Sequence, residues 1–125
     1  MIKYSISQVA AKYGLEAHTL RFYEKEGILR PQRTPGGVRF YTREDLTRLE
    51  MTLCLKNTGM TLKEIRRYFQ LVGEGDVTLE EQLKIFETHR ERVLQEMRRM
   101  EESLAVITGK IDKTRQAIAA REAKN

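Results

Sequence analysis

The sequence has one cysteine, two prolines and no tryptophan, and aromatic residues make up only 7% of it. A single cysteine, Cys54, excludes an intrachain disulfide framework and is typical of a reducing compartment. No run approaches the roughly 18 to 20 apolar residues that cross a bilayer, and residues 1–5 lack the apolar core of an export signal. We therefore expect a cytoplasmic protein with no membrane partner.

The chain of 125 residues has the usual size of one domain, and its apolar content of 40% allows a modest core. Part of its stability is therefore expected to come from a partner. Residues 1–73 carry thirteen Lys and Arg against seven Asp and Glu, a net charge of +6, whereas residues 74–125 carry ten against eleven, a net charge of −1. This asymmetry places an attraction for polyanions in the first part, unless the surplus is only a solvated surface.

Two neighbouring segments indicate a nucleic-acid reader. Residues 17–24 form a short basic and aromatic helix, and residues 34–41 turn at Gly36-Gly37 into an alternating strand. Period-2 geometry places Val38 and Phe40 on the packed face of that strand and lets Arg39 and Tyr41 reach outward. A helix for a groove followed by a hairpin for the flanking backbone is the layout of a winged helix-turn-helix.

Capping signals delimit the other helices of the first part. Ser5 with Gln8, Thr42 with Asp45 and Thr61 with Glu64 each predict a helix start. In the helix after Thr61 the inward stripe is predicted to hold Leu62, Ile65, Phe69 and Val72, with Lys63, Arg66, Arg67 and Gln70 opposite it.

From Thr78, which is predicted to be boxed by Glu81, a seven-residue apolar repeat runs to about Ile118. Such a narrow seam buries itself best against a second helix, so a two-stranded coiled coil on the order of 60 Å long is expected. A long helix folded back on its own domain is the alternative. The predicted organisation is a DNA-binding head over residues 1–73, a linker over 74–77, and a dimerisation coil over 78–125 with a frayed end. The predicted dimer seam holds Leu79, Leu83, Phe86, Val93, Met97, Met100, Leu104, Ile107 and Ile111.

The candidate DNA contacts follow from the docking of a helix in the major groove. His18 and Thr19, early in the helix, are placed to reach base edges, and phosphates need cations or hydroxyl donors nearby. The phosphate candidates on the helix and the wing are Arg21, Tyr23, Arg39 and Tyr41. The alternatives are core packing for Tyr23 and a merely solvated surface for Arg21 and Arg39. Lys63 and Arg66, in a later helix, either touch outer phosphates or are simply solvated.

Residues for catalysis, metals and cofactors are sparse. No Ser-His-Asp set, acid pair or nucleotide fingerprint stands out, and His18 and His89 are the only imidazoles. His89 is expected to be a surface residue. We therefore expect neither an enzyme nor a protein with a cofactor or a metal.

Four segments in order carry a resemblance: Tyr4 to Ala10, Thr19 to Leu29, Gly37 to Tyr41 and Gly59 to Ile65. Together they resemble the MerR family of bacterial transcription regulators over about residues 2 to 72. The resemblance implies a mainly α fold with a winged head and an antiparallel dimerisation coil. It also implies a homodimer on a palindromic operator, which bends and untwists an over-long promoter so that RNA polymerase can engage it.

The effector is less constrained than the fold. Metal-sensing and iron-sulfur relatives need cysteines that this chain lacks, and multidrug-sensing relatives carry a large ligand domain that it is not expected to hold. Cys54 resembles the lone cysteine of the NmlR/AdhR-like branch, for which sensing of aldehydes or other electrophiles is implied. A reactive thiolate needs a nearby cation, with Arg90 or His89 as the candidates. The alternatives are that Cys54 is a small buried hydrophobe, or that the head binds a protein instead of DNA.

Overall fold

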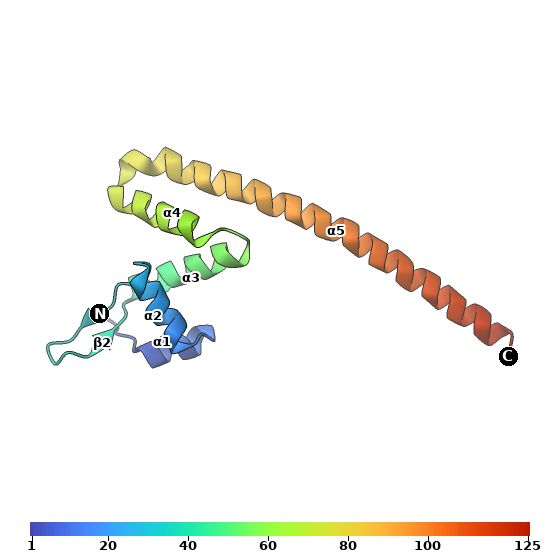
Figure 1. Ribbon diagram of the computed structural model, residues 1–125, viewed down its shortest axis with the longest axis horizontal. Helices are drawn as coiled ribbons and strands as arrows, with labels where there is room; N and C mark the ends of the chain where they lie inside the picture. Colours follow the sequence, from blue (N-terminus) through green and yellow to red (C-terminus); the bar gives the residue numbers. More distant parts are fainter. The chain divides into compact units, whose positions relative to one another are not determined.

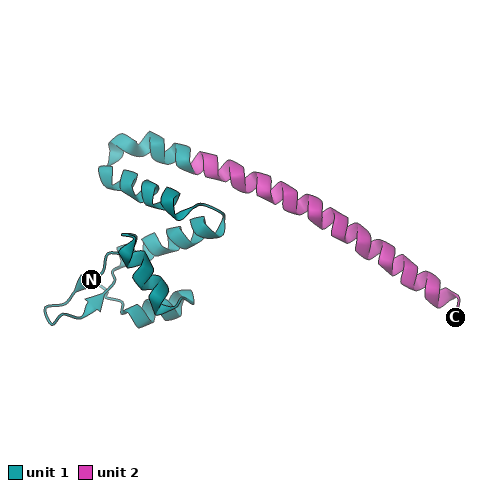
Figure 2. Cartoon of the chain, in the orientation of Figure 1, with its two compact units in different colours: residues 1–85 teal, residues 86–125 magenta.

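The computed structural model describes residues 1–125, and the chain forms two compact units, residues 1–85 and 86–125 (Figure 2). The predicted domain limits at residues 73 and 78 lie inside the first unit and remain a prediction about which parts fold alone. The first unit contains, in order, α1 (Ile6–Tyr13), α2 (Ala17–Lys25), β1 (Gln32–Arg33), β2 (Arg39–Phe40), α3 (Arg43–Asn57), α4 (Leu62–Glu74), a 3-10 turn (Asp76–Thr78) and the start of α5 (Leu79–Ala123).

Helices α1 and α2 pack against each other and form the helix-turn-helix (Figure 1). The predicted capping box opens α1: the Ser5 hydroxyl accepts from the Gln8 amide at 3.1 Å, and the Gln8 side chain accepts from the Ser5 amide at 2.8 Å. Gly14 ends α1 with φ of 65°, a left-handed conformation that favours glycine. The chain can therefore turn within three residues into α2.

The wing is a two-stranded antiparallel hairpin in which Gln32 lies opposite Phe40. Its turn is held by side chains. The Thr34 hydroxyl accepts from the Val38 amide at 3.1 Å, and the Arg33 guanidinium donates to the Gly37 carbonyl at 2.9 Å. Gly37 has φ of 84°, as the predicted Gly-Gly turn requires.

Helices α3 and α4 pack on each other and complete the head. Asp45, which is buried, accepts from the Thr42 amide at 3.2 Å and from the Arg30 amide at 2.8 Å, so one carboxylate both caps α3 and fixes the start of the wing. Thr61 and Glu64 form the predicted box of α4. The core joins every helix of the head through Val9, Leu20, Ile28, Leu29, Leu46, Leu49, Ile65 and Leu71.

The end of α4 differs from the prediction. Val72, expected to face inward, is 45% exposed, whereas Leu71 is fully buried. The reason lies in the 3-10 turn that packs against α4, because its Thr78 hydroxyl donates to the Leu71 carbonyl at 2.6 Å. The predicted box between Thr78 and Glu81 is likewise replaced: Thr78 accepts from the Gln82 side chain at 3.0 Å, and Glu81 pairs with Arg67 at 3.5 Å.

Helix α5 is a single helix of 45 residues, which spans about 68 Å at the usual rise per residue. His89 is its only buried residue, so the expectation of a surface histidine was wrong. The rest of the helix is mainly exposed, including its apolar residues. None of the helices combines the length and the apolarity that a membrane crossing requires.

Candidate nucleic-acid interface

Helix α2 separates a packed face from an outer face. Leu20 and Tyr23, three residues apart, are buried, whereas His18 and Arg21 are exposed and Thr19 is half-buried. His18, a proposed base-reading residue, and Arg21, the first phosphate candidate, thus share an accessible face, whereas Thr19 is less accessible. Tyr23 does not: its side chain is 3% exposed, so the core-packing alternative describes it better than a phosphate contact.

The wing places only one of its two predicted contacts at the surface. Arg39 is half-buried and its guanidinium lies 3.2 Å from the Glu24 carboxylate. Tyr41 is fully buried, so the expectation that it reaches outward was wrong. The physical reason is that Tyr41 follows β2 and pairs with Tyr4, whose amide donates to the Tyr41 carbonyl at 2.9 Å.

The packed face of the hairpin is also shorter than predicted. Phe40 is buried, with the Lys3 amine 4.9 Å from the centre of its ring, but Val38 is 65% exposed. Val38 lies close to the turn, beyond the two-residue strand, where no other element covers it. The apolar anchor of the wing is therefore Phe40 together with Tyr41.

Glu24 organises this surface, and sequence reasoning did not identify it. Its carboxylate accepts a hydrogen bond from the Tyr41 hydroxyl and pairs with Arg39, and its side chain is 14% exposed. Burial, reinforced by the Glu24 carboxylate, raises the pKa of Tyr41, so the hydroxyl remains a neutral donor. Because these partners lie 15 and 17 residues from Glu24, no local pattern could have revealed the link between α2 and the wing.

The cations of α4 are exposed, as predicted, but they differ in their surroundings. Arg66 forms an ion pair with Glu26 at the end of α2, and thereby ties α4 to the helix-turn-helix. Lys63, at the start of α4, is exposed, and its contact with an outer phosphate remains a prediction. Arg33 was not among the candidates, although its guanidinium braces the wing turn. The pairing of Arg66 with Glu26, 40 residues away, leaves no signal in the sequence, whereas the contact of Arg33 is local.

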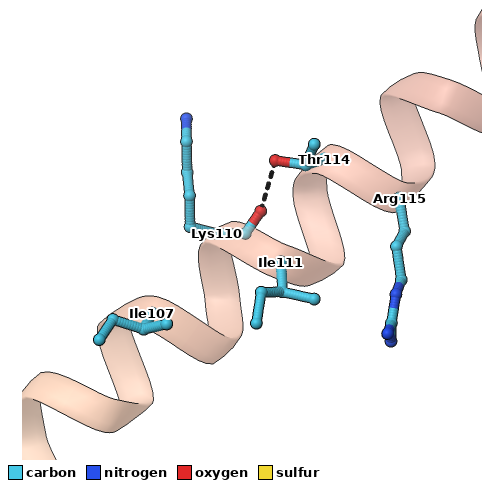
Figure 3. Close-up of a pocket in the computed structure, with 5 residues that line it drawn as sticks. All are labelled: Ile107, Lys110, Ile111, Thr114 and Arg115. Atoms are coloured by element: carbon cyan, nitrogen blue, oxygen red, sulfur yellow. Dashed lines mark hydrogen bonds between the residues drawn. The ribbon is translucent and has the colours of Figure 1, made fainter.

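The predicted dimer seam is apolar and exposed along α5. Met97, Met100, Leu104, Ile107 and Ile111 are between 44% and 65% exposed, and Phe86 and Val93 are half-buried. Near the C-terminal end, Ile107, Ile111 and Thr114 border a shallow, open groove on the surface of α5. Figure 3 shows Lys110 and Arg115 pointing to opposite sides of the helix at this groove, and the Thr114 hydroxyl donating to the Lys110 carbonyl at 2.7 Å.

Cys54 lies on α3 with its side chain exposed. The alternative in which it packs as a small buried hydrophobe therefore does not describe this chain. Its proposed cationic helpers, His89 and Arg90, belong to residues 86–125 and Cys54 to residues 1–85, so their proximity remains a prediction. The structure contains no group of three or more His, Cys, Asp or Glu residues suited to a metal ion.

Family models match most of the chain. The family described as "MerR HTH family regulatory protein" matches residues 4–71, and "MerR, DNA binding" matches residues 46–110. The chain belongs to the MerR family of DNA-binding transcriptional regulators. An HTH-type transcriptional regulator of Haemophilus influenzae is 45% identical over 91 residues, which cover 72% of this chain and 67% of that protein.

Other relatives place this MerR protein in the NmlR/AdhR-like branch. The HTH-type transcriptional regulator AdhR of Bacillus subtilis is 37% identical over 73% of this chain and 66% of its own length. Among solved structures, HiNmlR, described as a MerR family regulator that lacks the sensor domain and is bound to promoter DNA, superposes with a TM-score of 0.83. It is 38% identical, and the match covers 94% of each chain.

Proposed function

We propose that this MerR protein is a cytoplasmic homodimer that binds a twofold promoter site through two copies of its head and regulates transcription without catalysis. The observation that carries the proposal is the shared outer surface of α2, where His18 and Arg21 are exposed, together with the paired Arg39 of the wing. This arrangement offers a base-reading helix and flanking cations for phosphates. The similarity to HiNmlR, which is bound to promoter DNA, supports the same use of the head.

The dimer is proposed to form along α5. An isolated helix that exposes isoleucine, leucine and methionine in one seam is unfavourable in water, and pairing with a second copy removes that apolar surface. Because the family coil is antiparallel, the two chains would be related by a twofold axis, which matches the symmetry of a palindromic operator.

The proposed mechanism is distortion of the promoter. Two coupled heads can use contact energy to bend and untwist the DNA between them, and RNA polymerase then engages a promoter whose spacer is otherwise too long. An effector needs only to favour one of two states of the dimer. The basic head argues against the alternative of a module that binds only proteins, since such a module has little need for the positive charge.

Salt dependence tests the DNA-binding proposal. We expect the affinity of the purified dimer for duplex promoter DNA, measured by fluorescence anisotropy, to fall steeply as salt rises, because phosphate contacts release counterions. A nearly flat response would favour the protein-interaction module.

The division of labour on the surface is tested by three substitutions. Arg21→Ala and Arg39→Ala should weaken binding to specific and unrelated DNA alike, whereas His18→Ala should change which sequences are preferred. Arg115→Ala removes the same charge from α5 and serves as the control. Equal losses on all sequences for the three head variants would contradict this assignment.

A response to electrophiles through Cys54 is a second proposal, and the exposure of its thiol favours it. Exposed thiolates react with electrophiles, whereas buried structural cysteines are inert. Cys54→Ser should leave DNA binding intact and abolish the transcriptional response to an aldehyde in run-off transcription. An unchanged response would assign no sensory role to the thiol.

A further inference from the structure

A pocket of about 370 Å³ lies between α3 and α4 in the head, away from the outer face of α2. Cavities of this size are typical of small-molecule sites, which combine apolar walls with a few polar groups. This pocket has both: its apolar walls include Met51, Phe69 and Val72, and its charged groups are Arg30, Glu44 and Arg48.

Arg48 is the least satisfied of these groups. Its Nη2 donates to the Gly27 carbonyl at 3.1 Å, and its guanidinium carbon lies 5.3 Å from the centre of the Phe69 ring. Its Nε, however, is buried and has no hydrogen-bond acceptor. The Nε has therefore lost water without gaining an acceptor, which is unfavourable in the absence of a further acceptor or a negative charge.

The charge balance around the pocket is also incomplete. Burial, followed by repulsion from Arg30, lowers the pKa of Arg48, although Asp45 and Glu44 act in the opposite direction. Asp45 is itself engaged by the Thr42 and Arg30 amides. Asp45 does not line the pocket. The charged residues that do are Arg30, Arg48 and Glu44, so the lining has a net charge of +1.

We propose that this pocket binds a small organic monoanion, a carboxylate attached to an apolar body. The carboxylate matches the planar donors of Arg30 and Arg48, and the apolar body lies against Met51, Phe69 and Val72. A single negative charge balances the lining, whereas a doubly charged phosphate would also meet the repulsion of Glu44.

The site is connected to the wing through Arg30. This residue directly precedes Pro31 and β1, and its amide donates to the buried Asp45 that caps α3. A ligand held by the Arg30 side chain therefore contacts the chain where the wing begins. Modulation of DNA affinity by the ligand follows from this connection, and this second step rests on the proposed function, whereas binding itself does not.

Phenylacetate is a suitable probe, with phenylacetamide as the neutral control of the same shape. In an NMR titration of the full-length dimer without DNA, phenylacetate should shift amide signals of α3 and α4. Phenylacetamide should bind about tenfold more weakly or worse, because it lacks the charge that strengthens hydrogen bonds to arginine. Equal affinity for the two probes would overturn the proposal.

Two pocket variants and a matched control sharpen the test. Arg30→Gln and Arg48→Gln should each weaken phenylacetate binding by about tenfold or more, whereas Arg43→Gln, an exposed arginine of α3 outside the pocket, should not. Because Arg48 contacts Gly27, circular dichroism must first show that Arg48→Gln is folded. If Arg48→Gln does not fold, Arg30→Gln alone tests the pocket, because the Arg30 side chain is exposed and its loss should not disturb folding. Binding unaffected by Arg30→Gln would refute the assignment.

The second step is measured separately, as operator affinity with and without saturating phenylacetate. A change in affinity that Arg30→Gln removes supports the connection to the wing, and no change refutes that connection while the titration still reports on the pocket. Phenylacetate binding only to a seam variant that cannot dimerise would show that a second copy fills the pocket, and would overturn the proposal. DNA binding that fails altogether, with phenylacetate still bound, would refute the proposed function alone.

Discussion

Residues 1–85 and residues 86–125 differ in where their apolar side chains lie. Every buried apolar residue of the chain lies in the first unit, whereas the second unit buries only His89 and exposes its leucines, isoleucines and methionines. The apolar side chains of the head therefore pack against one another within the same unit. Most of the apolar seam of the second unit is exposed in the single chain, which fits the dimer that its repeat predicts.

The ion pairs of the two units show the same contrast. In the head, Arg39 pairs with Glu24 and Arg66 with Glu26, across 15 and 40 residues of sequence. In the second unit the pairs are local and exposed, as for Arg99 with Glu96 and Arg98 with Glu91. Exposed local pairs contribute little to stability, so α5 depends on its seam, whereas the head also uses charge to fix the wing.

The largest effect is expected from a charge in the seam. Ile107→Lys should weaken dimerisation by about 3 to 6 kcal/mol per dimer, because burial of an isoleucine contributes about 1.5 to 3 kcal/mol and the change occurs in both chains. Sedimentation should then show monomers where the natural chain gives dimers. The control is Val106→Lys, at a neighbouring exposed apolar residue outside the seam. Equal effects of the two substitutions would exclude the proposed seam.

A cavity in the core of the head should have the next largest effect. Leu20 is fully buried, and Leu20→Ala should lower the free energy of unfolding of the head by about 2 to 5 kcal/mol. Phe22→Ala, two residues along the same helix, removes a side chain that is 44% exposed and should cost much less. Denaturant titrations of both variants measure the difference, and a larger loss for Phe22→Ala would reverse the assigned faces of α2.

Much of the fold could be predicted because its signals are local. The capping pairs of α1, α3 and α4, the Gly-Gly turn and the seven-residue repeat each depend on residues a few positions apart, and the structure confirms the corresponding elements. The predicted exposure of His18 and Arg21 also follows from helical periodicity within α2.

The errors arose where distant segments meet. Tyr41 was assigned to the outer face because alternation was extended beyond a strand of two residues, whereas its pairing with Tyr4 buries it. Val72, expected to face inward, is exposed and Leu71 is buried because the turn at Thr78 packs against α4. Glu24 was missed because its partners are on the wing. Such contacts are properties of tertiary packing, and periodicity alone does not contain them.

Tyr41→Phe tests the corrected role of this residue. Removal of the hydroxyl deprives the partly buried Glu24 of a donor, so the free energy of unfolding of the head should fall by about 1 to 2 kcal/mol. Non-specific DNA affinity at fixed salt should change much less than it does in Arg39→Ala. A variant with unchanged stability but a large loss of DNA affinity would restore Tyr41 as a phosphate contact.

The smallest effect is a dependence of stability on pH, confined to alkaline solution. Burial, together with a hydrogen bond to Glu50, raises the pKa of Tyr13 from its ordinary value of 10.0 to about 12, and burial with Glu24 raises that of Tyr41 as well. Well below pH 10 both hydroxyls are protonated in the folded and the unfolded chain, so they add no pH dependence there.

Above pH 10 the unfolded chain loses these protons first, so the free energy of unfolding should fall as the pH rises towards 12. Phenolate absorbance measured against pH, for the folded chain and for the chain in denaturant, gives the difference in the pH at which the tyrosines ionise. Tyr13→Phe and Tyr41→Phe should each remove part of the difference in phenolate titration between the folded chain and the chain in denaturant. Because Glu50 is on α3 and Glu24 on α2, the two variants report separately on how firmly α1 and the wing are attached to the head.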